Sequence, residues 1–119
     1  MTDAPEAAGG DGARPDYVLV GTKAGATAQR FLRDAVELAR SGHRVWLFLV
    51  SDGVATGIRG AAGTALSDLA AAGGRIWIDD FTLSQRALHK APLVPGAVRV
   101  SMAELAARLM APDTKVVWH

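Results

Sequence analysis

The chain has 119 residues, which is enough for one compact domain with a hydrophobic core and too few for two. Hydrophobic residues make up 50% of it and aromatic residues 6%, so we expect a core built mainly from Ala, Val, Leu and Ile. A formal net charge of +1 gives no global attraction to nucleic acid or to an anionic membrane. The absence of cysteine excludes disulfides, thiolate metal sites and any persulfide carried on these residues.

Residues 1–15 are rich in Gly, Ala, Pro and Asp, a composition typical of a disordered leader. They do not combine a basic start with an apolar segment, as a secretory signal does. No apolar run reaches the roughly 20 residues needed to cross a bilayer. We therefore predict a cytoplasmic protein whose folded domain covers residues 16–119.

Beyond the leader, apolar runs alternate with helical patterns in the order β-α-β-α-β-α-β-α-β. In chain order we expect a strand at 17–20, a helix at 27–41, a strand at 44–50, a loop with a helical turn at 54–63, a helix at 64–72, a strand at 76–78, a helix at 82–89, a strand at 97–100, a helix after Ser101 and a strand at 115–118. Such alternation predicts a single three-layer α/β/α domain around a mostly parallel five-stranded sheet.

The last helix is predicted to open at a capping box formed by Ser101 and Glu104. The spacing of its apolar residues predicts that four side chains face the core, namely Met102, Leu105, Ala106 and Leu109.

The loop after the first strand, GTKAGAT at 21–27, is rich in glycine but matches neither phosphate-binding fingerprint. We expect a turn in which Thr27 caps the following helix. Lys23 leaves the carboxyl end of the first strand, where it would be able to reach an anionic ligand.

Carboxylates follow the second and third strands. Asp52 comes just after the second, and Asp79 and Asp80 come just after the third. If the two strands are neighbours, these carboxylates gather at one edge of the sheet, where they would serve as general acid and base or ligate a hard cation such as Mg²⁺. The structural alternatives are an ordinary turn at Asp52-Gly53 and a helix cap at Asp80.

Four further side chains lie on the helix predicted after the third strand. Thr82 and Gln85 fit a capping box, and Arg86 lies one turn beyond Thr82. Arg86 would bind an anion or pair with a nearby aspartate or a neighbouring subunit. His89 would titrate near neutral pH or contact the last carbonyls of the helix. No two histidines have metal-ligand spacing, and we predict no resident metal or cofactor.

Three tryptophans, Trp46, Trp77 and Trp118, are many for one small core. At least one is expected in a subunit interface, where aromatic residues are enriched. This predicts an oligomer.

Two segments resemble the DsrE/DsrF-like (TusD-like) sulfur-relay family. Residues 48–54, FLVSDGV, are similar to the second strand and loop of the family. Residues 79–88 are similar to its Cys-x-x-Cys-x-x-x-Arg-Gly-Leu segment, and the order and length of the elements also agree over residues 17–118. The resemblance implies that the reactive cysteine position is Asp79 and the second cysteine position is Thr82. Arg86 matches the family's arginine, and Ala87 replaces its glycine.

In that family a cysteine carries a persulfide, which a carboxylate cannot do because the persulfide needs a thiolate. The resemblance therefore implies a cysteine-less member, which would act as an oligomeric binding or assembly subunit. Its expected partners are further copies in a trimer or hexamer, or a relative that bears the cysteine. The alternative is an enzyme with a repurposed cleft. In that enzyme Asp79 would be the general acid or base, Thr82 or His89 would assist, and Lys23, Asp52 and Arg86 would line the site for a small anionic substrate.

Overall fold

The computed structural model describes residues 16–61 and 63–119, so the predicted leader at 1–15 lies outside the described residues. In chain order the elements are β2 (Asp16–Gly21), α1 (Ala26–Arg40), β3 (Val45–Leu49), the 3₁₀ helix η1 (Ser51–Gly57), α2 (Ala65–Ala71), β4 (Arg75–Asp79), α3 (Asp80–Gln85), β5 (Ala97–Val100), α4 (Met102–Leu109) and β6 (Thr114–Trp118). None of the helices in the described part of the chain has the length and apolar character needed to cross a membrane.

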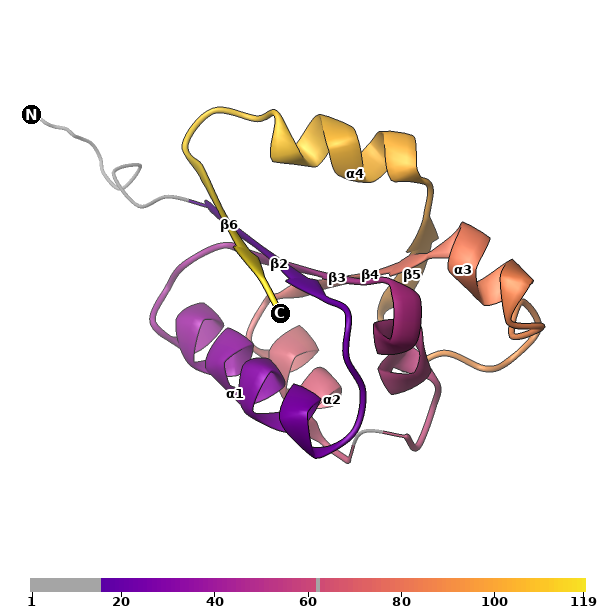
Figure 1. Cartoon of the computed structure of the whole chain (residues 1–119). Coiled ribbons are helices and arrows are strands. Elements are labelled where there is room, and N and C mark those ends of the chain that lie inside the picture. The colour runs from indigo at the N-terminus through magenta and orange to yellow at the C-terminus, as the bar shows by residue number, and fades with distance from the viewer. Residues whose placement is uncertain (1–15, 62) are drawn as a thin grey trace, which may run out of the picture.

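The five strands form one sheet in the order β5-β4-β3-β2-β6, and every neighbouring pair is parallel (Figure 1). The chain builds outward from β2 to β5 and then returns to place β6 beside β2. All five residues of the central strand β3 are buried, as expected for a parallel strand covered on both faces. The predicted single α/β domain with a five-stranded sheet is confirmed.

The helices divide between the two faces of the sheet. Figure 1 shows α1 and α2 on one face, which we name the α1–α2 face, and α4 alone on the other, which we name the α4 face. On the α1–α2 face, Leu47 and Ile78 pack with Phe31 and Leu69 of the helices. On the α4 face, buried side chains of β2, β3 and β5 pack with Leu105 of α4. The smaller core is therefore the one beneath α4.

Helix α4 begins as predicted, because Ser101 and Glu104 form the reciprocal hydrogen bonds of a capping box. Its inward face is narrower than the sequence pattern predicts. Leu105 is buried and Leu109 is half-buried, but Met102 and Ala106 are exposed. The expectation that all four face the core is wrong, since one helix of eight residues covers only part of this face.

The start of α1 also differs from its prediction. The helix begins at Ala26 after Gly25, whose φ of 77° is easy only for glycine, and no side chain caps it. Thr27 lies inside the first turn, so the expectation that it is the cap is wrong.

The helical turn predicted within 54–63 is the short helix η1, which begins earlier, at Ser51, and its position depends on Gly53. A Cβ atom at this residue would lie 2.1 Å from the carbonyl oxygen of Gly21. Glycine therefore allows η1 to pack directly against the end of β2, and this contact fixes the place of the neighbouring Asp52.

Candidate functional site at the ends of the strands

The two predicted carboxylate positions do lie at the same edge of the sheet. Because β3 and β4 are adjacent and parallel, Asp79 at the end of β4 and Asp52 in η1 both follow the carboxyl ends of neighbouring strands. This edge, which we name the carboxyl edge, is where open parallel sheets bind ligands. The geometry gives the two carboxylates different surroundings.

Asp79 is the cap of helix α3. It is 3% exposed, and one carboxylate oxygen accepts a hydrogen bond from the backbone N–H of Phe81, with an N···O distance of 3.3 Å. The other oxygen accepts a hydrogen bond from the hydroxyl group of Thr82, which is also buried. The helix therefore begins at Asp80, and the predictions that it begins at Thr82 and that Asp80 caps it are wrong. Asp79, the last residue of β4, takes the capping role because its side chain reaches the free N–H of Phe81.

Arg86 pairs with Asp52. The guanidinium lies 2.8 Å from the carboxylate, and both side chains are largely exposed. The nearby aspartate is one of the partners predicted for Arg86, and the pair joins the end of α3 to η1. An exposed pair of this kind contributes about 0–1 kcal/mol, so it orients Arg86 more than it stabilises the domain.

Lys23 and His89 take part neither in the contact of Asp79 with Thr82 nor in the ion pair of Asp52 with Arg86. His89 is exposed and follows α3, which ends at Gln85, so the expectation that it continues the face of that helix is wrong. Lys23 is exposed in the loop after β2, as predicted. In the described part of the chain, no group of three His, Asp or Glu side chains is arranged to hold a metal ion.

At the end of α3, Ala87 stands where the family segment has a glycine. Leu88 and Ala87 donate backbone hydrogen bonds to the carbonyl oxygens of Leu83 and Ser84, which is the Schellman pattern. This pattern needs a left-handed residue at the position of Ala87, whose φ is 58°. A glycine at that position, as in the family segment, would adopt this backbone without strain.

A second cluster of functional side chains was missed by the sequence predictions. Trp46 of β3 is 8% exposed, and three guanidinium groups surround its ring. The distances from the ring centroid to the guanidinium carbons are 4.0 Å for Arg108, 5.2 Å for Arg44 and 5.8 Å for Arg75. These are cation–π distances, so the arginines take the place of an apolar cover over the indole.

One carboxylate serves this cluster. Asp16 of β2 lies 2.7 Å from Arg108 and 3.1 Å from Arg44. The cluster lies on the α4 face at the amino ends of the strands, opposite to the carboxyl edge. It therefore joins α4 to three strands.

The sequence does carry a signal for this cluster. Arg-x-Trp occurs twice, as Arg44-Val45-Trp46 and as Arg75-Ile76-Trp77, and residues two apart on a strand share a face. The register pairs Trp46 with Arg75, which places the second arginine beside the first tryptophan. Arg108 is distant in the sequence, and nothing in the local pattern predicts that it reaches Trp46.

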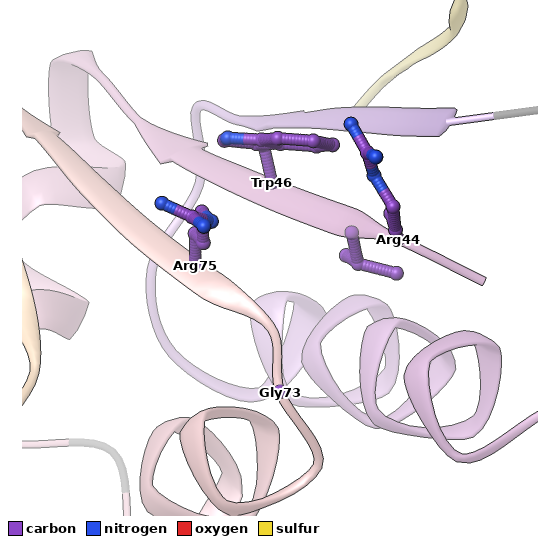
Figure 2. Close-up of a pocket in the computed structure, with 5 residues that line it drawn as sticks. Arg44, Trp46, Gly73 and Arg75 are labelled. Carbon is purple, nitrogen blue, oxygen red and sulfur yellow. The ribbon is translucent and has the colours of Figure 1, made fainter. Parts of the chain in front are cut away.

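A hollow with a volume of about 250 Å³ adjoins the cluster. Its lining residues are Arg44, Val45, Trp46, Gly73 and Arg75. Figure 2 shows Arg44 and Arg75 on the two sides of Trp46, above the turn that contains Gly73. The hollow therefore has cationic sides and an aromatic wall.

The described geometry defines a small, wholly parallel α/β domain in which the side chain of Asp79 caps a helix at the carboxyl edge. No protein-family model matches the sequence, and no curated protein matches it.

Solved structures do match. The ychN protein from E. coli has a TM-score of 0.80 and 25% sequence identity, over 88% of this chain and 99% of that chain. MTH1491, a protein of unknown function from Methanobacterium thermoautotrophicum, has a TM-score of 0.66 and 17% identity, over 87% of this chain and 99% of its own. Each likeness covers nearly the whole neighbour, so the shared fold is complete rather than partial.

Proposed function

We propose that the chain is a cysteine-less member of the DsrE/DsrF-like family that acts as an oligomeric assembly subunit and not as a sulfur carrier. The likeness to the two solved structures supports the family's fold, and the 79–88 segment lies where the resemblance requires, at the end of β4. The sequence contains no cysteine, and sulfane sulfur transfer needs a thiolate. Binding and assembly need no thiolate.

The observation that carries the assembly role is the exposure of the edge strand β6. Val116, Val117 and Trp118 are 39%, 42% and 62% exposed. The register pairs Val116 and Trp118 with β2 residues that face α4, while Val117 points to the other face. Large apolar side chains are therefore open to solvent on both sides of this edge.

An edge of this kind favours a second copy of the chain as its occupant. The outer side of β6 has backbone groups that can pair with another strand, and natural edges are normally protected by charges, bulges or a covering element. In β6 the one charged side chain is that of Lys115. A net charge of +1 opposes self-association only weakly. We expect copies of the chain to cover β6 in a trimer or hexamer, or a family relative to take that place.

The contacts at the carboxyl edge support this role over the enzymatic alternative. A general acid or base needs a carboxylate oxygen that can reach substrate. Both oxygens of Asp79 already accept hydrogen bonds from the first turn of α3, and its side chain is buried. Catalysis by Asp79 would require the loss of these capping bonds. The enzymatic roles of Asp79, Thr82 and His89 stay predictions, as does anion binding by Lys23, Asp52 and Arg86.

Native mass spectrometry tests the proposal. We expect the wild-type chain to have the mass of a trimer or hexamer and Trp118→Gln to shift the population to smaller species. Phe81→Gln is the matched control, because Phe81 is 64% exposed but lies on α3. This helix follows β4, which β3 and β2 separate from β6 in the sheet. Circular dichroism checks that both variants fold. A monomeric wild type, or a Trp118→Gln variant that assembles like the wild type, would overturn the role of β6.

The same spectra test the enzymatic alternative. Asp79→Asn keeps a good capping residue, so folding and assembly should be nearly unchanged. A small molecule retained in stoichiometric amount by the wild type and lost in Asp79→Asn or Arg86→Ala would instead favour a working cleft at the carboxyl edge.

A further inference from the structure

We propose that the hollow beside Trp46 is a binding site for an oxyanion of the phosphate class, held between Arg44 and Arg75. The hollow lies at the amino ends of β3 and β4, so it is separate from the carboxyl edge and from the β6 surface used in the assembly proposal. Trp46 and Arg75 belong to strands of the sheet, and Arg44 directly precedes β3. Such a site has a fixed frame.

The first argument is the local charge. Three guanidinium groups surround one indole, and Asp16 is the carboxylate that pairs with two of them. Among the ion pairs of the described residues, none includes Arg75. The cluster therefore carries an excess of positive charge, and a bound anion would reduce the repulsion among its members.

The second argument is that the three arginines differ in accessibility. Arg108 lies nearest the ring, and its side chain is 17% exposed, so it covers Trp46 and holds α4 to the sheet. The side chain of Arg44 is 70% exposed, and Arg75 is also exposed. Both line the hollow, whereas Arg108 does not. The two accessible arginines are therefore the ones placed to contact a ligand.

The third argument is the match of chemistry and size. Guanidinium groups bind phosphate and carboxylate oxygens through paired N–H donors, and phosphate offers oxygens to two arginines at once. An indole wall lowers the local dielectric constant and strengthens such contacts. A volume of about 250 Å³ is below the usual range for drug-sized ligands, which favours a phosphate group or a small phosphate ester.

The test is an NMR titration of the full chain with inorganic phosphate at constant ionic strength. The indole N–H signal of Trp46 is assigned by its loss in Trp46→Phe. We expect a saturable shift of this signal in the wild type, and at least tenfold weaker binding in Arg75→Gln and in Arg44→Gln. Arg33→Gln is the matched control, because Arg33 is an exposed arginine that pairs with Asp68 between α1 and α2. It should bind like the wild type.

Adenosine 5′-monophosphate and adenosine distinguish the two sources of a phosphate group. Tighter binding of the monophosphate than of inorganic phosphate would assign the site to organic phosphate esters, and equal binding would assign it to the free anion. Three results would overturn the proposal. The shift could rise linearly without saturation, it could be equal in Arg75→Gln and the wild type, or adenosine could produce it as well as its monophosphate does. None of these results depends on the oligomeric state.

Discussion

The two faces of the sheet are built in different ways. On the α1–α2 face, seventeen buried residues of the described chain form one cluster, nearly all of it aliphatic. On the α4 face the corresponding cluster has six, and Trp46 within it is covered by arginines instead of by apolar side chains. The first face therefore supplies most of the apolar burial. The second keeps cationic and aromatic groups accessible, and both surfaces proposed to bind lie on it or at its margin.

The lengths of the helices account for much of this difference. Helix α1 has 15 residues and packs beside α2, whereas α4 has eight and covers its face alone (Figure 1). Val98 on β5 and Trp118 on β6 remain exposed at opposite edges of the α4 face. A helix of eight residues over a five-stranded sheet therefore leaves both edges of this face open.

The largest effect is expected from the same substitution made on each face. Leu69 of α2 is fully buried, while Leu109 of α4 is only partly buried. We expect Leu69→Ala to lower the free energy of unfolding by about 2–5 kcal/mol, because it removes buried methyl groups and leaves a cavity. Leu109→Ala should cost about 1 kcal/mol, since less apolar area is lost. Urea unfolding measures both, and equal losses would contradict the contrast between the faces.

The fold was predictable because the local patterns agree with the global arrangement. The continuous apolar run in residues 45–49 predicts a buried central strand, and the Ser101–Glu104 capping box fixes the start of α4. Asp52 and Asp79 at one edge follow directly from adjacent parallel strands. Each of these features depends either on residues that are close together in the sequence or on the general geometry of parallel sheets, so each can be predicted from the sequence.

The parts that were missed depend on competition and on distant contacts. Asp79 and Thr82 are both good capping residues, and in the folded chain it is Asp79 that accepts the hydrogen bond from the N–H of Phe81. Arg108 reaches Asp16 across 92 positions of sequence, and β6 pairs with β2 at the far side of the sheet. No local pattern contains these contacts, so the Trp46 cluster becomes visible only in the folded chain, as does the identity of the exposed tryptophan, Trp118.

A smaller effect is expected at the ends of helices α1, α2 and α3. Helices α1 and α2 both end with a glycine in the left-handed position, Gly42 and Gly73, whereas α3 has Ala87 there. We expect Ala87→Gly to raise the free energy of unfolding by about 0.5–1 kcal/mol, because the strain of a left-handed alanine is removed. Gly42→Ala is the reciprocal control and should destabilise by a similar amount. Thermal unfolding checks both, and a loss of stability in Ala87→Gly would show that its backbone is not strained.

The smallest effect is expected at the exposed pair of Arg33 and Asp68, which joins α1 to α2 at an N···O distance of 2.7 Å. The hydrogen bond from Arg33 holds the pKa of the Asp68 carboxyl below its ordinary value of 3.8. A carboxylate whose pKa is lowered by folding favours the folded state above the ordinary value, and this contribution is lost as the pH falls through the lowered pKa. Stability should therefore decline slightly more between about pH 5 and about pH 3 in the wild type than in Asp68→Asn.

Added salt is expected to weaken this pair more than the pair of Asp16 and Arg108 on the α4 face. The side chains of Asp16 and Arg108 are 18% and 17% exposed, compared with 32% and 50% for Asp68 and Arg33. Salt at about 1 M shortens the range of electrostatic interaction to about 3 Å, and it screens exposed pairs more than partly buried ones. The difference between Asp68→Asn and the wild type should vanish in high salt, while Asp16→Asn should still destabilise, because it leaves the guanidinium of Arg108 partly buried without its carboxylate. If high salt removed the stability difference for Asp16→Asn as well as for Asp68→Asn, Asp16 would behave as a surface charge like Asp68. Its ion pair with Arg108 would then contribute no more to the α4 face than an exposed pair does.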